Sequence, residues 1–158
     1  MPSASTLRFP PGYGRATRTI PWADVQARLE AATAYWLSTV RRDGRPHVVP
    51  LDGIWVDDVW WYGGAPDTVH IRSVESNPHV VMHLPEPHQA VIVEGVVRRT
   101  SPAHELALRM AAAANEKYAH YGARNDAATY ASALGLFPTR VLAWSAFPSD
   151  ATRFDFQL

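Results

Sequence analysis

Cysteine is absent from this chain of 158 residues. The absence excludes disulfide bonds, thiolate zinc sites and cysteine nucleophiles. Long apolar runs are also lacking, and none approaches the ~20 residues that a helix needs to cross a bilayer. Residues 1–13 show neither the basic start nor the apolar stretch of a secretion signal. We therefore expect a cytoplasmic protein with no membrane partner.

Net charge is lacking as well, because fifteen basic residues balance fifteen acidic ones. Proteins that bind nucleic acid normally concentrate a basic excess on one face. Here the densest basic cluster is Arg41, Arg42 and Arg45, and Asp43 interrupts it. We therefore expect no nucleic-acid partner.

Tryptophan, in contrast, is plentiful, with six residues. Such a content suits a β-rich core or a flat aromatic ligand. The length fits one domain, and we place it at residues 19–158. Residues 1–18 carry several prolines and glycines with little periodicity, which predicts an N-terminal arm rather than a packed element.

Short β-rich segments dominate the remaining sequence. Asp43-Gly44 and Asp57-Asp58 are suited to tight turns between them. A series of short antiparallel strands joined by tight turns indicates a closed sheet, and thus a mainly β (α+β) fold. The predicted strands span residues 35–41, 46–56, 59–62, 79–84, 90–98, 141–147 and 152–156.

Three helices are predicted among these strands. Apolar residues at helical spacing after Pro21 predict a helix over 21–33. Asp67 or Thr68 suits the N-cap of a short helix that reaches Ser76, and Ser101-Pro102 suits the start of a longer one that reaches about residue 121. Residues 122–137 are predicted to be a loop with a short helical turn.

Three segments carry a family resemblance: YWLSTVRRDGRPHVVPLDGIWVDD, WWYGGAPDTVHIRSVESNPHVVMHL and AVIVEGVV. In this order they resemble the pyridoxamine-5′-phosphate-oxidase-like split-barrel family, in particular its branch of deazaflavin-dependent enzymes. The closing stretch AWSAFPSDATRFDF is similar to the C-terminal signature of that branch. The resemblance implies a six-stranded antiparallel split β-barrel with flanking helices. It also implies a homodimer whose two cofactor sites are built from both subunits.

The resemblance further implies where a cofactor, coenzyme F-420 or FMN, is bound. Its ring would lie along one strand beside Thr39, and its phosphate would lie at the end of a later strand, where consecutive glycines and a helix start suit an anion. His70 stands where family members often have a second basic residue, and Arg153 is a candidate for a cofactor or cross-dimer contact. The implied binding residues are Thr39, His47, Val48, Val49, Pro50, Leu51, Gly63, Gly64, Thr68, His70, Arg72 and Arg153.

Histidines supply the other candidates. His47, on the ring-facing strand, is the candidate catalytic proton donor, and a surface histidine is the alternative. His79 and His83 stand four residues apart, but the flanking prolines favour a strand over a metal-binding helix, so no metal site is expected. Glu94 is interpreted as a structural partner of a nearby arginine.

The function predicted from the resemblance is an oxidoreductase that transfers a hydride between the cofactor ring and a small organic substrate. A non-catalytic protein that binds a flavin or tetrapyrrole is one alternative, motivated by Val69 and His70 in place of a basic residue. A haem-handling protein with His47, His70 or His83 as ligand is another.

Overall fold

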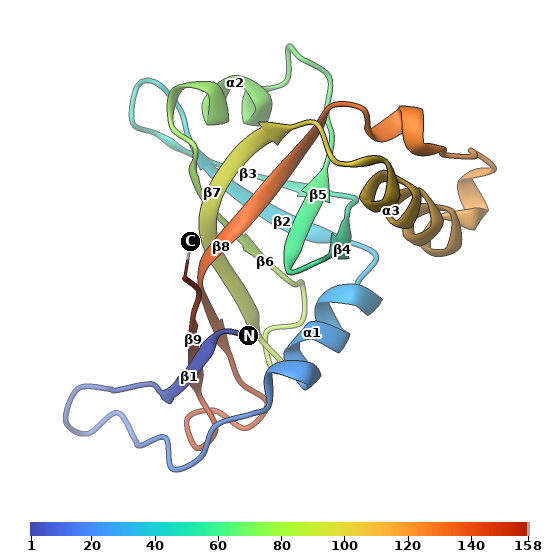
Figure 1. The fold of residues 1–158 in the computed structure, drawn as a ribbon. Helices are drawn as coiled ribbons and strands as arrows, with labels where there is room; N and C mark the ends of the chain where they lie inside the picture. The colour runs from blue at the N-terminus through green and yellow to red at the C-terminus, as the bar shows by residue number, and fades with distance from the viewer. Residues whose placement is uncertain (158) are drawn as a thin grey trace.

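The computed structural model describes residues 1–157, which form one predominantly antiparallel sheet with three α-helices. Figure 1 shows the strands curling around a common core, with the two chain termini near each other midway along the molecule. The strands are β1 (Ser3–Thr6), β2 (Tyr35–Val40), β3 (Pro46–Leu51), β4 (Ile54–Val56), β5 (Val59–Tyr62), β6 (His79–His83), β7 (Val91–Thr100), β8 (Ala133–Ala143) and β9 (Thr152–Asp155).

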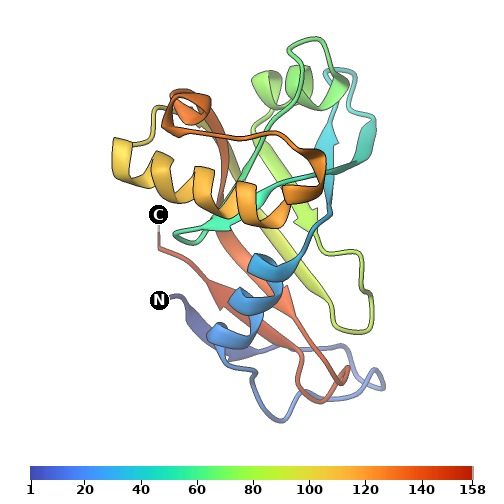
Figure 2. The same cartoon turned by 90° about the vertical axis from the view of Figure 1, so that its right-hand side faces the viewer.

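The helices lie outside the sheet. They are α1 (Trp22–Ala31), α2 (Val69–Ser76) and α3 (His104–Lys117), and short 3-10 turns follow at Ala119–Tyr121 (η1) and Ala127–Tyr130 (η2). In Figure 2, α1 and α3 lie in front of the sheet, whereas α2 lies over its upper end. None of these helices is long and apolar enough to cross a membrane.

The strand order is β1-β9-β8-β7-β6-β2-β3, and β5 joins β4 to β8. The long β8 therefore pairs with β7, β9 and β5, which wraps the sheet around its apolar core. The mainly β split-barrel prediction is confirmed, but residues 1–157 contain nine strands rather than six. The strand predicted over 46–56 is broken before Ile54, because Gly53 packs so closely on the Trp60 indole that a Cβ would clash.

The largest error concerns β8. The sequence predicts a loop over residues 122–137 and a strand that begins at residue 141. In the structure, β8 begins at Ala133 and ends at Ala143. Gly135 and Pro138 masked this strand in the sequence. Both are accommodated locally: Pro138 lies opposite Gly95 next to a bulge in β8, where Thr139 has no partner in β7, and Gly135 packs against Trp61.

The N-terminal arm is also more ordered than its composition predicted. Its β1 pairs with β9, so that Ser3 lies opposite Asp155. Farther along, the N–H of Leu7 donates to Ala151 O and the N–H of Thr17 donates to Ser149 O, both at 2.9 Å. These long-range pairings could not be read from local periodicity, and they join the arm to the domain.

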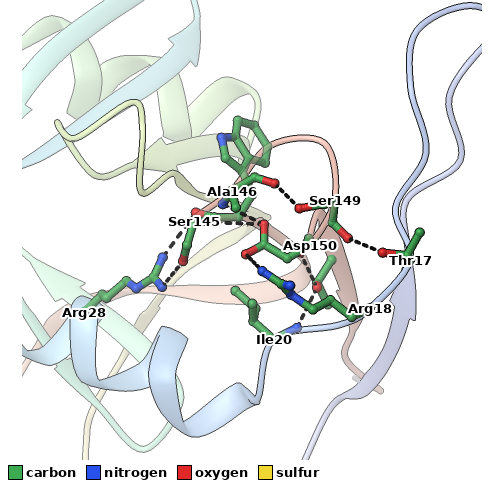
Figure 3. A network of polar contacts seen from close by, with 10 residues as sticks. Thr17, Arg18, Ile20, Arg28, Ser145, Ala146, Ser149 and Asp150 are labelled. Carbon is green, nitrogen blue, oxygen red and sulfur yellow. Dashed lines mark hydrogen bonds and ion pairs between the residues drawn. The ribbon is translucent and has the colours of Figure 1, made fainter.

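A polar network closes this end of the molecule (Figure 3). The Asp150 side chain is 3% exposed and accepts from the N–H groups of Ser145 (3.1 Å) and Ala146 (2.8 Å). Arg18 lies 3.7 Å from the same carboxylate. Arg28 of α1 donates to the Ser145 hydroxyl and to Trp144 O, so α1, the arm and the C-terminal loop are held together.

Two local details differ from the sequence-based predictions. At the first hairpin only Gly44 has a positive φ (81°), so this is not a two-residue turn with both centres left-handed. That geometry occurs at Asp57 and Asp58, with φ of 55° and 56°. The helix expected from Ser101-Pro102 begins instead at His104, and its N-cap Ala103 forms no side-chain cap.

One face of the sheet is not covered by any helix within residues 1–157. Along β2, β6 and β7 the inward residues are buried and the outward ones are half-buried or exposed. Trp36 and His83 stack on the outward face with ring centroids 6.5 Å apart. Glu94 on this face pairs with Arg140 at 3.2 Å, which confirms its interpretation as a structural partner of an arginine.

Candidate functional site

Strand β3 is one of the free edges of the sheet, because it pairs only with β2 in the described chain. The hairpin begins with a bond from Arg41 N to Arg45 O, so the odd-numbered residues of β3 bond to β2. Pro46 and Pro50 therefore occupy positions whose missing N–H would face away from the sheet. Between them, Val48 presents its N–H and C=O at the open edge, and its side chain is 53% exposed.

Beneath α2, polar side chains from β2, β3 and the helix gather. Thr39 and His47 are opposite each other in register, and His70 of α2 is close enough for His47 to influence its charge. Thr39 and His70 are buried, and Thr39 Oγ1 and His70 Nε2 have no hydrogen-bond partner within residues 1–157. Burial lowers the pKa of His70, a hydrogen bond with the Gly63 backbone opposes this, and His47 adds to the lowering, so His70 is neutral near pH 7.

His47 is held by Arg41. The distance from Arg41 Nη2 to His47 Nδ1 is 3.4 Å. Because a guanidinium only donates, Nδ1 must accept, and the proton of a neutral His47 ring is therefore on Nε2. The second ring nitrogen is left to donate to a ligand.

The Gly63-Gly64 pair has two distinct roles. An added Cβ on Gly63 would meet nothing within 4 Å, so its backbone is open to a ligand. A Cβ on Gly64 would clash with the His70 ring, so this glycine allows His70 to pack. Thr68 is the N-cap residue of α2, but its hydroxyl donates to Ala65 O at 2.7 Å and forms no side-chain cap.

Arg72 lies away from this glycine turn. It lines a depression of about 450 Å³ between α2 and the β2–β3 hairpin, together with Arg41 and Arg42. Asp43 also lines the depression but pairs with Arg45 at 2.7 Å. Among residues 1–157 no salt bridge engages Arg41, Arg42 or Arg72. The predicted phosphate residues are thus divided between the two sides of α2.

Arg153 is separated from the β3 edge. It lies on β9 at the far side of the sheet and pairs with Asp155 at 2.7 Å. Because Leu142 lies opposite Arg153 and Ile92 opposite Leu142, the outward face of the sheet includes Arg153. Within one subunit, Arg153 is not part of the cluster at Thr39 and His47.

A cavity of about 440 Å³ lies between the β3–β4 bend, the end of β5, the start of β8 and the segment after α3. Sequence reasoning missed it, although Tyr118, Tyr121 and Tyr130 recur in a segment otherwise poor in apolar residues. The lining combines aromatic, polar and charged residues: Asp52, Gly53, Ile54, Trp61, Tyr62, Gly63, Gly64, Arg99, Ala114, Tyr118, Tyr121, Ala123, Asn125, Thr129, Tyr130, Ser132, Ala133 and Leu134.

The described residues contain no group of three or more His, Asp or Glu side chains arranged to hold a metal ion. His79 and His83 both lie on strand β6, and His83 Nδ1 is 2.9 Å from Leu84 O. The three histidines considered as haem ligands do not converge. His83 is on the outward face of the sheet, whereas His47 and His70 lie under α2.

Comparison with known proteins places this geometry in context. The family model described as pyridoxamine 5′-phosphate oxidase matches residues 22–145. No curated protein matches the chain. Among solved structures, a protein named F-420 reductase is similar with a TM-score of 0.56 at 22% identity, over 84% of this chain and 98% of that chain.

Two other similar structures are named for the binding of different cofactors. A FAD-binding protein from Mesorhizobium loti has a TM-score of 0.59 at 19% identity, and the match covers 88% of this chain and 98% of that one. A heme binding protein from Mycobacterium smegmatis has a TM-score of 0.63 at 19% identity, with 84% of this chain and 58% of that one covered. At these identities the likeness shows the fold alone.

The residues of the β3–α2 corner fit a planar, anionic cofactor. The open edge at Val48 offers a donor and an acceptor, and Thr39, opposite the neighbouring His47, and His70 have buried polar atoms without partners within residues 1–157. Buried polar atoms without partners are uncommon in folded proteins and mark places where a partner is to be expected. Three arginines beside α2 supply the positive charge that a phosphate requires.

Proposed function

Because the chain belongs to the pyridoxamine 5′-phosphate oxidase family, we propose that it is an oxidoreductase that uses FMN or coenzyme F-420. The bound cofactor would supply hydride transfer to or from a small organic substrate. The protein would position the cofactor and the substrate, exclude water with an apolar wall and supply one proton donor. The observation that carries this proposal is the free β3 edge at Val48 beside the unpartnered polar atoms of Thr39 and His70.

The edge of β3 suits the ring of either cofactor. Flavin and deazaflavin rings share a pyrimidine edge on which an N–H stands between two carbonyl oxygens. Val48 can donate its N–H to one of those oxygens and accept the ring N–H at its C=O. Pro46 and Pro50 remove competing N–H donors from this edge, and they also protect it from pairing with another strand.

The anionic tail of the cofactor would extend toward α2. The first N–H groups of a helix suit anions, and the start of α2 packs on the glycine turn, because Gly64 lies against the His70 ring. Arg72, with Arg41 and Arg42, supplies charge on the other side of the same helix. Gly63, Gly64, Thr68 and Arg72 therefore stay in the proposal, but on two sides of α2 rather than in one corner, and Arg41 and Arg42 are added to them.

His47 is the proposed proton donor. Arg41 leaves its proton on Nε2, and the half-buried ring lies on the strand proposed to hold the cofactor. Thr39 and His70 would position the ring through hydrogen bonds. His70, being neutral, would act through a hydrogen bond of its unpartnered Nε2 rather than through charge.

A homodimer completes the proposed site. The outward sheet face carries Trp36, Ile92 and Leu142 in adjacent register positions, next to the ion pairs of Glu94, Arg140 and Asp155. In a symmetric dimer, a second copy of the chain would cover these apolar positions. It would also place its own acidic and basic side chains opposite those of the first copy, so that the surface is self-complementary. Arg153, on this face, could then contact the partner or its cofactor. A cytoplasmic location stays a prediction.

The test is titration of the purified protein with FMN, coenzyme F-420 and haem, followed by absorbance and fluorescence. We expect saturable binding of FMN or F-420, with one cofactor per subunit of a dimer, and substrate-dependent oxidation of the reduced form. A Soret band with no flavin binding would favour the haem-handling alternative. Tight cofactor binding without turnover of any enone or quinone would favour the binding-protein alternative.

A further inference from the structure

The cavity beside α3 is separate from the β3 edge and is built as a binding site. Its volume of about 440 Å³ is within the range of roughly 300–1,000 Å³ typical of small-molecule sites. Trp61, Tyr118, Tyr121 and Tyr130 line it from three elements. Tyr118 and Tyr121 stack with their planes within 2° and their centroids 5.7 Å apart, and stacked rings of this kind suit a flat ligand.

The wall of the cavity is held in place by hydrogen bonds. The Tyr118 hydroxyl accepts from Gly53 N at 2.8 Å and lies 2.9 Å from Gly53 O. Asn115 of α3 donates to Asn125 O at 2.9 Å and accepts from Asn125 N at 2.8 Å. The segment after α3, although it has little regular structure, is therefore fixed to the helix, and the cavity does not depend on a loose loop.

The cavity is lined by one acidic and one basic side chain, Asp52 and Arg99. Asp52 and Tyr121 both line the cavity, and the nearby Asp52 carboxylate raises the pKa of the Tyr121 hydroxyl. Arg99 also lines the cavity, and no acidic partner of Arg99 is found within residues 1–157. Arg99 therefore remains available for an anion.

Gly63 connects the cavity with the proposed cofactor corner. It lines the cavity and has open space beside its Cα. A ligand in the cavity would thus lie next to the cofactor rather than in its place. We infer that the cavity binds the substrate and that the substrate is a planar aromatic compound with an anionic group that Arg99 recognises. This inference rests on the proposed function only in naming the ligand a substrate.

The test measures binding to cofactor-free protein by calorimetry, with 2-naphthoate and its neutral counterpart 2-naphthamide as probes. We expect 2-naphthoate to bind at least tenfold more tightly, as a charge-assisted hydrogen bond implies. Arg99→Gln should abolish that preference. The neighbouring Arg98 is the matched control, because it stacks over Phe137 on the opposite face of β7 and Arg98→Gln should change nothing.

A second pair of variants tests the cavity itself. Ala123 is exposed and lines the cavity, so Ala123→Trp should block it, whereas Ala128→Trp in the same segment should not. Failure of 2-naphthoate to bind at millimolar concentration would overturn the inference. Equal effects of the Arg98 and Arg99 variants would also overturn it. Arg72→Gln separates this result from the proposed function, because it should weaken cofactor binding and leave naphthoate binding unchanged.

Discussion

The corner under α2 and the C-terminal loop both bury polar side chains, but only in the loop do these side chains find hydrogen-bond partners within the described chain. In the loop, Asp150 accepts two backbone N–H bonds and faces Arg18, and Thr152 accepts from Ile20 N and donates to Asp150 O. Under α2, Thr39 and His70 are equally buried and have polar atoms without partners. The C-terminal loop thus satisfies these polar groups within the chain, whereas the corner under α2 leaves two polar atoms that a ligand would satisfy.

Replacing Asp150 should give the largest change in stability. Asp150→Ala leaves the N–H groups of Ser145 and Ala146 without their acceptor and detaches the arm at Arg18. We expect the free energy of unfolding to fall by about 2–4 kcal/mol in urea denaturation. Asp67→Ala, at an exposed loop position, is the control and should lose less than about 0.5 kcal/mol. An Asp150 variant as stable as the control would remove the contrast between the two regions.

Arg72 should affect ligand binding and not stability. Arg72→Ala should weaken FMN or F-420 binding by roughly 1.5–3 kcal/mol, since it removes a charged hydrogen-bond donor. Its side chain is exposed and in no salt bridge of the described chain, so the unfolding midpoint should stay constant. Arg124→Ala, at another exposed position, should leave affinity intact. Unchanged cofactor affinity in the Arg72 variant would exclude this residue from the site.

A matched pair of threonines sharpens the comparison directly. Thr152→Val removes a hydroxyl with two bonds and should cost about 1–2 kcal/mol of unfolding free energy. Thr39→Val removes a hydroxyl with none, so the free protein should be as stable or more stable by up to about 1 kcal/mol. The same Thr39 variant should bind cofactor more weakly. Equal destabilisation by both changes, seen in parallel denaturation curves, would refute the proposed difference.

The pH dependence of stability should report on His70. Because its pKa is lowered in the folded protein, the unfolded chain takes up a proton first as the pH falls. The contribution of His70 to the free energy of unfolding is therefore fully present above about pH 6.5. Below that pH it is lost by no more than about 1.4 kcal/mol per pH unit. His70→Gln should flatten this loss between pH 7.5 and 5.5. An identical pH profile in both proteins would mean that His70 titrates normally.

The sequence predicted the parts of the fold that local chemistry decides. The strands at 35–40, 59–62 and 79–83 follow from β-branched and aromatic runs, and α1 follows from the spacing of Trp22, Val25 and Leu29. The pairing of β1 with β9 and the early start of β8 were missed, because partners distant in sequence stabilise them.

The candidate site was predicted only in outline. The β3 strand and the glycine turn were located by resemblance, but the separation of Arg72 from Gly63 depends on how α2 packs. The cavity with Arg99 was not foreseen, since its wall comes from four separate segments. Such convergence depends on the tertiary structure and leaves no local pattern to detect.

The most direct test of the cofactor site is amide hydrogen exchange at Val48, measured by NMR with and without saturating FMN or coenzyme F-420 and at constant oligomeric state. A ring bonded to the β3 edge should slow exchange of the Val48 N–H at least tenfold, while amides of the C-terminal loop stay unchanged. Saturated cofactor binding with Val48 exchanging at its original rate would contradict the account.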